Sequence, residues 1–134
     1  MKAKIQHEIQ EYCSLLRLNA IGEHLEETIT SATDYEGFLH QLLRMEVDAE
    51  EKRARERKIK AAKFPYRKYI EDLEMNLLPE GMQKRLPELC ALDFIREGKN
   101  IIMTGNPGTG KTHTAIGLGI KDCEQGYRAL YTTI

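Results

Sequence analysis

The sequence predicts an α/β protein in which an all-α helical N-terminal domain is followed by the opening βαβ unit of a second domain. Three observations favour this fold class: amphipathic periodicity over residues 5–29, a long charged helical pattern, and a short apolar run that leads into a glycine-rich turn. The expected segments, in chain order, are a helical domain with a basic end (residues 1–63), a connector with short helices (residues 64–97) and the start of the second domain (residues 98–134).

The first half of the chain is expected to be helical. Apolar residues recur at three- and four-residue steps over residues 5–29, and Gly22 is expected to divide this region because an interior glycine costs a helix about 1 kcal/mol relative to alanine. Thr33 lies three positions before Glu36, as in a capping box, and a second helix is predicted to start near Asp34. The helical pattern then continues to the break at Phe64-Pro65.

The second half predicts a strand, a helix and another strand. Ile101–Thr104 is a compact apolar run typical of a buried strand, and Tyr127–Thr133 has the composition of a second one. Between them a helix is expected from about Lys111 to Gln125, with Gly126 as its stop signal. This order predicts a βαβ unit.

The composition is that of a soluble globular protein, with 41% apolar and 31% charged residues in 134. No apolar stretch approaches the roughly 20 residues of a membrane-spanning helix, and the first residues lack the apolar middle of a signal peptide, so a cytoplasmic location and no membrane partner are expected. Cys13, Cys90 and Cys123 are not in a CxxC spacing and are expected to be buried small residues. The four histidines form no i, i+4 pair and predict no metal site.

The net charge of -1 conceals a strong segregation. Residues 1–51 carry 11 acidic and 4 basic side chains, whereas residues 52–68 carry 9 basic side chains and 1 acidic one. A short basic segment in an otherwise acidic protein predicts a polyanionic partner for that segment.

One motif points directly to chemistry. Residues 105–112 read Gly-Asn-Pro-Gly-Thr-Gly-Lys-Thr and satisfy the P-loop pattern G-x-x-x-x-G-K-[ST] between an expected strand and helix. The glycines allow backbone N–H groups to surround a phosphate, Lys111 would reach the β- and γ-phosphates of ATP, and the hydroxyl of Thr112 would ligate Mg²⁺. The alternative is a plain glycine-rich turn, which does not need Lys and Thr at these places.

His113 follows the motif directly and could point towards the nucleotide, although a first-turn residue facing solvent or a neighbouring loop is the alternative. The predicted nucleotide-binding residues are Gly105, Asn106, Pro107, Gly108, Thr109, Gly110, Lys111, Thr112 and His113.

Gly117 and Gly119 stand inside the helix that follows the motif, where each costs up to about 1 kcal/mol. Ile116, Ile120 and Cys123 share a face of this helix, so Gly119 is expected to let the helix approach its sheet closely. We interpret this as a core role.

The basic segment is predicted to bind DNA. Its cations spread over most of the circumference of a helix, which suits phosphate contacts better than base readout from one face. Phe64, Tyr66 and Tyr69 could stack on bases, but anchoring of the turn is the expected role. The alternative is a solvated helix balanced by the preceding acidic residues. The predicted DNA-binding residues are Lys52, Arg53, Arg55, Arg57, Lys58, Lys60, Lys63, Arg67 and Lys68.

Several of these stretches together resemble a known family. The sequences Ile-Lys-Ala-Ala-Lys-Phe-Pro-Tyr (residues 59–66), Ile-Glu-Asp-Leu (70–73), Leu-Asp-Phe-Ile (92–95), residues 105–114 and Gly-Tyr-Arg (126–128) resemble the IstB family of transposition helper ATPases, the partners of IS21-type transposases. The resemblance covers nearly the whole chain. It implies a helical N-terminal domain, an AAA+ ATPase domain, assembly of several copies on DNA with ATP, and stimulation of the transposase.

The resemblance also implies that Walker B, the sensors and the arginine finger would follow residue 134. A chain of these 134 residues is therefore expected to bind ATP without hydrolysing it, and no catalytic residue is identified. Two alternatives are a helicase loader of the related DnaC type, separable by pull-down with helicase or transposase, and a P-loop kinase. The hundred residues before the motif count against a kinase.

Overall fold

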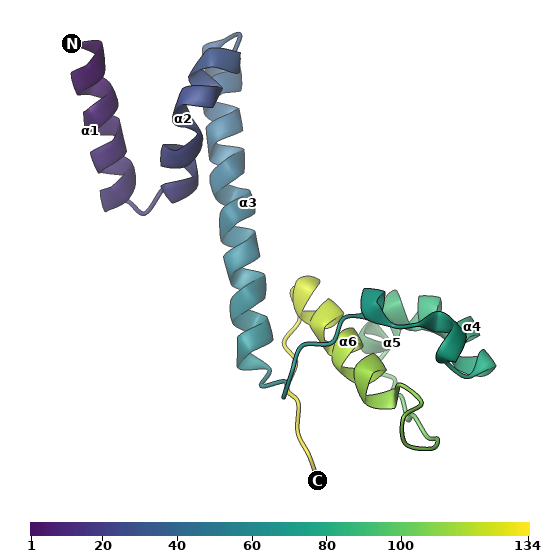
Figure 1. Cartoon of the computed structure of the whole chain (residues 1–134). Helices are drawn as coiled ribbons and strands as arrows, with labels where there is room; N and C mark the ends of the chain where they lie inside the picture. The colour runs from purple at the N-terminus through teal and green to yellow at the C-terminus, as the bar shows by residue number, and fades with distance from the viewer. The chain divides into compact units, whose positions relative to one another are not determined.

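The computed structural model describes residues 1–134 and consists of helices joined by irregular segments (Figure 1). No helix combines the length and apolar character needed to cross a lipid bilayer. The elements, with η for the 3-10 helices, are α1 (Lys2–Leu15), α2 (Asn19–Ser31), α3 (Tyr35–Ala61), η1 (Ile70–Asp72), η2 (Met75–Leu77), α4 (Glu80–Cys90), α5 (Asp93–Arg96) and α6 (Lys111–Glu124).

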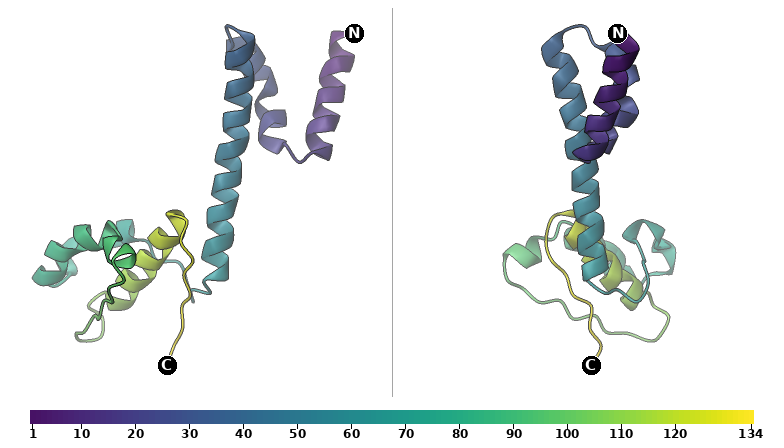
Figure 2. Two further views of the ribbon diagram at one scale, coloured as in Figure 1. Left: turned by 180° about the vertical axis from the view of Figure 1, so that it is seen from behind. Right: turned by 90° about the vertical axis from the view of Figure 1, so that its left-hand side faces the viewer.

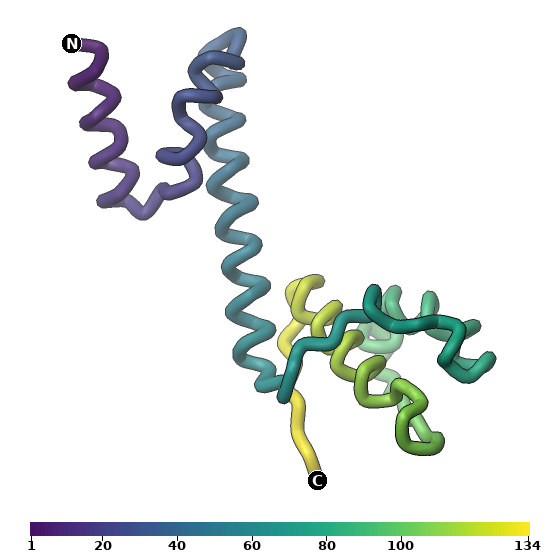
Figure 3. The backbone as a smooth tube through the Cα atoms, in the orientation of Figure 1, coloured from purple at the N-terminus to yellow at the C-terminus, as the bar shows by residue number.

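The α/β prediction is wrong, because the chain contains no strand and no sheet. A strand exists only where a neighbouring strand takes its backbone hydrogen bonds. Residues 101–104 and 127–133 do not form such a ladder; the backbone N–H of Tyr131 donates instead to the carbonyl of Ala62, at 2.8 Å. Ile102 and Leu130 are 87% and 67% exposed. Figure 3 shows the C-terminal stretch as a single irregular tube. The apolar composition of these two stretches was therefore insufficient to predict strands.

The chain divides into two compact units, Met1–Ala54 and Arg55–Ile134, which are described separately. In the first unit the chain reverses direction between α1 and α2, and these two helices pack together (Figure 2). The core of this unit consists of buried Cys13, Ile21, Leu25 and Leu42. The amphipathic periodicity of the sequence produced this helical core.

The break between the first two helices is not at Gly22, as the sequence predicted. It lies at Leu16–Leu18, where Arg17 adopts a φ of 59°, and Gly22 lies inside α2. The Gly22 carbonyl accepts a hydrogen bond from Gln10 Nε2 at 2.9 Å, and a Cβ on Gly22 would lie 3.1 Å from Gln10 Oε1. The glycine thus permits close contact between α1 and α2, which offsets its low helix propensity.

The start of α3 uses a different cap from the predicted one. The carboxylate Oδ1 of Asp34 accepts a hydrogen bond from the backbone N–H of Gly37 at 2.9 Å. This is the geometry of an N-cap residue bonding to the third residue of the helix. The predicted start near Asp34 is confirmed, but the cap is Asp34 and not Thr33.

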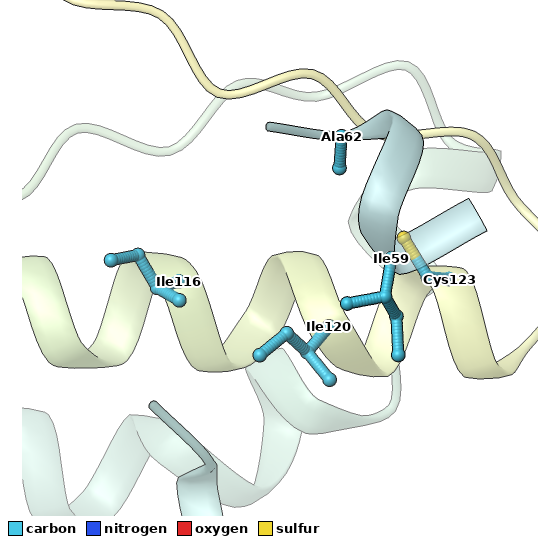
Figure 4. Close-up of a cluster of buried hydrophobic side chains, with 5 residues drawn as sticks. All are labelled: Ile59, Ala62, Ile116, Ile120 and Cys123. Atoms are coloured by element: carbon cyan, nitrogen blue, oxygen red, sulfur yellow. The ribbon is translucent and has the colours of Figure 1, made fainter. Parts of the chain in front are cut away.

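The second unit has its core between the end of α3 and α6. Figure 4 shows Ile59 of α3 and Ala62, which directly follows this helix, beside Ile116, Ile120 and Cys123 of α6, all of them buried. The predicted burial of the cysteines is confirmed for Cys13 and Cys123, whereas Cys90 is partly buried. The predicted helix after the glycine-rich motif is also present, and Gly126 follows it with a φ of 94°.

The two glycines inside α6 contact the connector and not a sheet. A Cβ on Gly119 would lie 2.7 Å from the Phe64 ring, and a Cβ on Gly117 would lie 2.7 Å from Ile70 Cδ1 and 3.1 Å from its backbone nitrogen. The predicted close approach therefore exists, but with a different neighbour. Lys121 adds an ion pair to Glu71 at 2.9 Å, which lowers the pKa of Glu71 and raises the pKa of Lys121.

We expect Gly119→Ala to destabilise the second unit. The added methyl group must displace the Phe64 ring, which also packs against Tyr131 with ring centroids 6.3 Å apart. Overpacking costs about 1–3 kcal/mol, and the gain in helix propensity returns about 1 kcal/mol, so the net loss is expected to be about 1 kcal/mol. Urea unfolding would measure it.

Gly81→Ala in α4 is the matched control, because nothing lies within 4 Å of a Cβ at that position. This variant should keep or slightly raise the stability. A Gly119→Ala protein as stable as wild type would contradict the close packing of Phe64 on α6.

Candidate functional site

The motif of residues 105–112 consists of a loop that ends at Gly110 and the first two residues of α6, Lys111 and Thr112. Gly108 and Gly110 have φ values of 81° and 84°, in the left-handed region that favours glycine. At Gly110 a Cβ would also lie 2.9 Å from Leu78 Cδ2. No side chain caps the N-terminus of α6, so its first N–H groups are available to an anion.

The side chain of Lys111 lies against the backbone of this loop. Its Nζ donates to the carbonyl oxygens of Gly105 at 2.6 Å and Asn106 at 2.8 Å, and it lies 3.4 Å from Thr109 Oγ1. The Thr109 hydroxyl donates in turn to the Asn106 carbonyl at 2.8 Å. The ammonium charge is thus held beside the loop backbone, within reach of any phosphate that enters the loop.

Two threonines in the first turns of α6 have different environments. Thr114 is buried and its hydroxyl donates to the Gly110 carbonyl at 2.7 Å, so it stabilises the loop-to-helix junction. Thr112 is the second residue of α6. Of these two threonines, only Thr112 is therefore exposed.

His113 contacts the connector. Its Nε2 lies 2.7 Å from the carbonyl oxygen of Tyr69. Because a carbonyl can only accept, Nε2 carries the proton in this contact. A direct contact of His113 with the nucleotide stays a prediction.

A pocket of about 530 Å³ adjoins the loop, a volume typical of small-molecule sites. Sequence reasoning did not identify its wall on α4, where Arg85 brings a second cation to the pocket that Lys111 lines. Residues 20 or more positions from a motif carry no local signal that they will lie beside it. The lining residues are Pro79, Gly81, Met82, Arg85, Leu89, Asn100, Ile101, Ile102, Met103, Thr104, Thr109 and Lys111.

The predicted DNA-binding cations fall into groups with different surroundings. Lys58 is half-buried, and its Nζ donates to the Gly126 carbonyl at 2.7 Å. Arg53, in the first unit, pairs with Glu50 at 3.0 Å. In the second unit, Arg67 forms a two-pronged ion pair with Glu56, which raises the pKa of Arg67.

The other cations of the segment are exposed. Lys68 Nζ lies over the ring of Tyr66, 5.7 Å from its centroid. Four of them are exposed and make no ion pair within the chain: Arg55, Lys60 and Lys63 in the second unit and Lys52 in the first unit. Arg57 is exposed as well. Lys52, Arg55, Lys60 and Lys63 can therefore reach a polyanion without first breaking an ion pair within the chain.

Comparison with known proteins places these features in a family context. The profile of the family described as IstB-like ATP binding protein matches residues 13–134. The chain is 35% identical over 133 residues to a protein of Geobacillus stearothermophilus named for ATP binding in insertion sequence IS5376, covering 96% of this chain and 53% of that protein.

Two further relatives are similar. A protein of Pseudomonas aeruginosa named for ATP binding in IS21 is 33% identical over 129 residues, covering 93% of this chain and 49% of its own length. One from Bacteroides fragilis (strain YCH46), named likewise for an IS21-like element, is 34% identical, covering 98% and 68% respectively. The chain thus spans about half the length of the first two relatives.

Proposed function

We propose, because this chain belongs to the IstB-like ATP-binding protein family of insertion sequences, that the loop of residues 105–112 is the site at which it binds Mg-ATP. The observation that carries this proposal is the Lys111 ammonium beside two loop carbonyls, at the uncapped end of α6.

The described residues fit a nucleotide phosphate group. The backbone of the loop, with left-handed conformations at Gly108 and Gly110, can direct several N–H groups towards phosphate oxygens. Lys111 would exchange its bonds to the carbonyls of Gly105 and Asn106 for bonds to phosphate. The hydroxyl of Thr112 would ligate Mg²⁺, which bridges the β- and γ-phosphates and neutralises part of their charge.

We further propose that the whole protein acts on DNA as a helper of transposition. Its exposed cations Arg55, Lys60 and Lys63 support contact with DNA phosphates. The proposed protein partners are the transposase of the element and further copies of the chain. The relatives are named for insertion sequences, which favours transposition over helicase loading, and a pull-down that retained a replicative helicase but no transposase would contradict this choice.

Thr112→Val tests the metal part of the nucleotide site. Wild-type protein should bind a fluorescent ATP analogue more tightly with Mg²⁺ than with EDTA, and Thr112→Val should lose this difference because its side chain has no oxygen ligand. Thr112→Ser keeps the hydroxyl and should keep the difference. Titration by fluorescence anisotropy would measure all three.

Thr132→Val is the control, since Thr132 is an exposed threonine far along the chain from the loop. If Thr112→Val retained the full effect of Mg²⁺, the metal assignment would be wrong. If wild-type protein did not bind the analogue, the nucleotide proposal would be wrong as a whole.

A further inference from the structure

The basic segment (residues 52–68) and the residue that follows it carry three aromatic residues, and two of these pack against the core. The Phe64 ring lies against Gly119 of α6 and packs with Tyr131. Tyr69 is partly buried against the same core, and its carbonyl contacts His113. Tyr66 is the exception, because it remains 49% exposed and does not belong to this cluster.

The residues next to Tyr66 are conformationally restricted, and cations lie on both sides of it in the sequence. Pro65 before it restricts the chain, and Arg67 after it is tied to Glu56 of α3 by two side-chain bonds. Lys68 Nζ lies over the ring, 5.7 Å from its centroid, a cation–π contact. The residues on both sides of Tyr66 are thus restrained, while its ring stays accessible to a flat partner.

An aromatic ring among lysines and arginines fits single-stranded nucleic acid. Bases stack on aromatic side chains with little sequence preference, while cations contact the phosphates of the same strand. A base inside a duplex already has neighbours on both faces, so a protein ring can stack only on a base that is unpaired or displaced. Tyr66 has the exposure and the neighbouring charges that this contact requires.

We propose that Tyr66 stacks on an unpaired base, so that the segment around it selects DNA with unpaired bases over fully paired duplex. This inference rests on the proposed contact between the basic segment and DNA. Lys68 and Lys63 contact the phosphates beside the stacked base, and Arg67 holds the backbone in place through Glu56.

The test compares two DNA probes of equal length and charge: a fully paired duplex and a duplex with a short central run of mismatches. Wild-type protein should bind the mismatched probe about tenfold more tightly, as expected for one aromatic–base stack. Tyr66→Ala should bind both probes equally, and Tyr66→Phe should keep the preference because it keeps the ring. Circular dichroism of each variant would verify folding.

The outcomes separate this inference from the proposed function. Equal binding of both probes by wild-type protein, or an unchanged preference in Tyr66→Ala, would overturn the stacking role while leaving the phosphate contacts intact. Failure of wild-type protein to bind either probe would overturn both. Loss of the preference in Tyr66→Ala, with unchanged affinity for paired duplex, would establish it.

Discussion

Lys111→Ala is expected to weaken binding of an ATP analogue by about 100-fold or more. The lysine is the cation placed at the loop mouth by its bonds to Gly105 and Asn106, and it would form charge-assisted bonds to two phosphates. Each bond of this kind contributes about 1.5–3 kcal/mol, so the loss of two lowers affinity by at least two orders of magnitude. A fluorescence anisotropy titration with Mg²⁺ would measure the change.

Lys121→Ala is the control for this variant. It removes the same charge from the same helix, but Lys121 pairs with Glu71 and does not line the loop or the pocket beside it. Affinity for the analogue should stay near the wild-type value. Equal binding by Lys111→Ala and wild-type protein would show that the nucleotide, if bound, occupies another site.

The second large effect is expected on DNA binding. Replacing Arg55, Lys60 and Lys63 together by alanine removes three exposed cations that make no ion pair within the chain. Counterion release predicts that the slope of log K against log salt becomes shallower by about 3. If the affinities of variant and wild-type protein become equal near 1 M salt, the variant binds about 100-fold more weakly near 0.15 M salt. Titration of a labelled duplex at several salt concentrations would measure both values.

A matched triple variant controls for net charge. Lys84, Arg96 and Lys99 are also exposed, comprise one arginine and two lysines, and pair with Glu80, Asp93 and Glu97 respectively. Their replacement by alanine should change DNA affinity little. Equal losses in the two triple variants would show that the basic segment has no special role.

The helices were the part of the fold that the sequence predicted best, and the strands were the part it predicted wrongly. The helix from Lys111 follows from local signals: glycine before it, apolar residues at helical steps within it, and Gly126 after it. Residues 101–104 have equally clear apolar character, but a strand needs a partner from elsewhere in the chain and none takes that place. A distant contact also decided the place of Gly22: local propensity predicted a helix break there, but its contact with Gln10 keeps it inside α2.

The sequence by itself determined the phosphate-loop pattern, the position of Lys111 at the start of a helix, the basic character of residues 52–68 and the family, because each depends on residues close together in the chain. Only the tertiary structure decided that the Lys58 ammonium donates a hydrogen bond to the Gly126 carbonyl. It also decided that Phe64 packs against the core while Tyr66 is exposed, and that Arg85 of α4 lines the pocket beside the loop. Helical hydrogen bonds join residues four positions apart and so follow from local sequence. The contacts that assign a cation or a ring to the core or to solvent join residues tens of positions apart, and only folding brings them together.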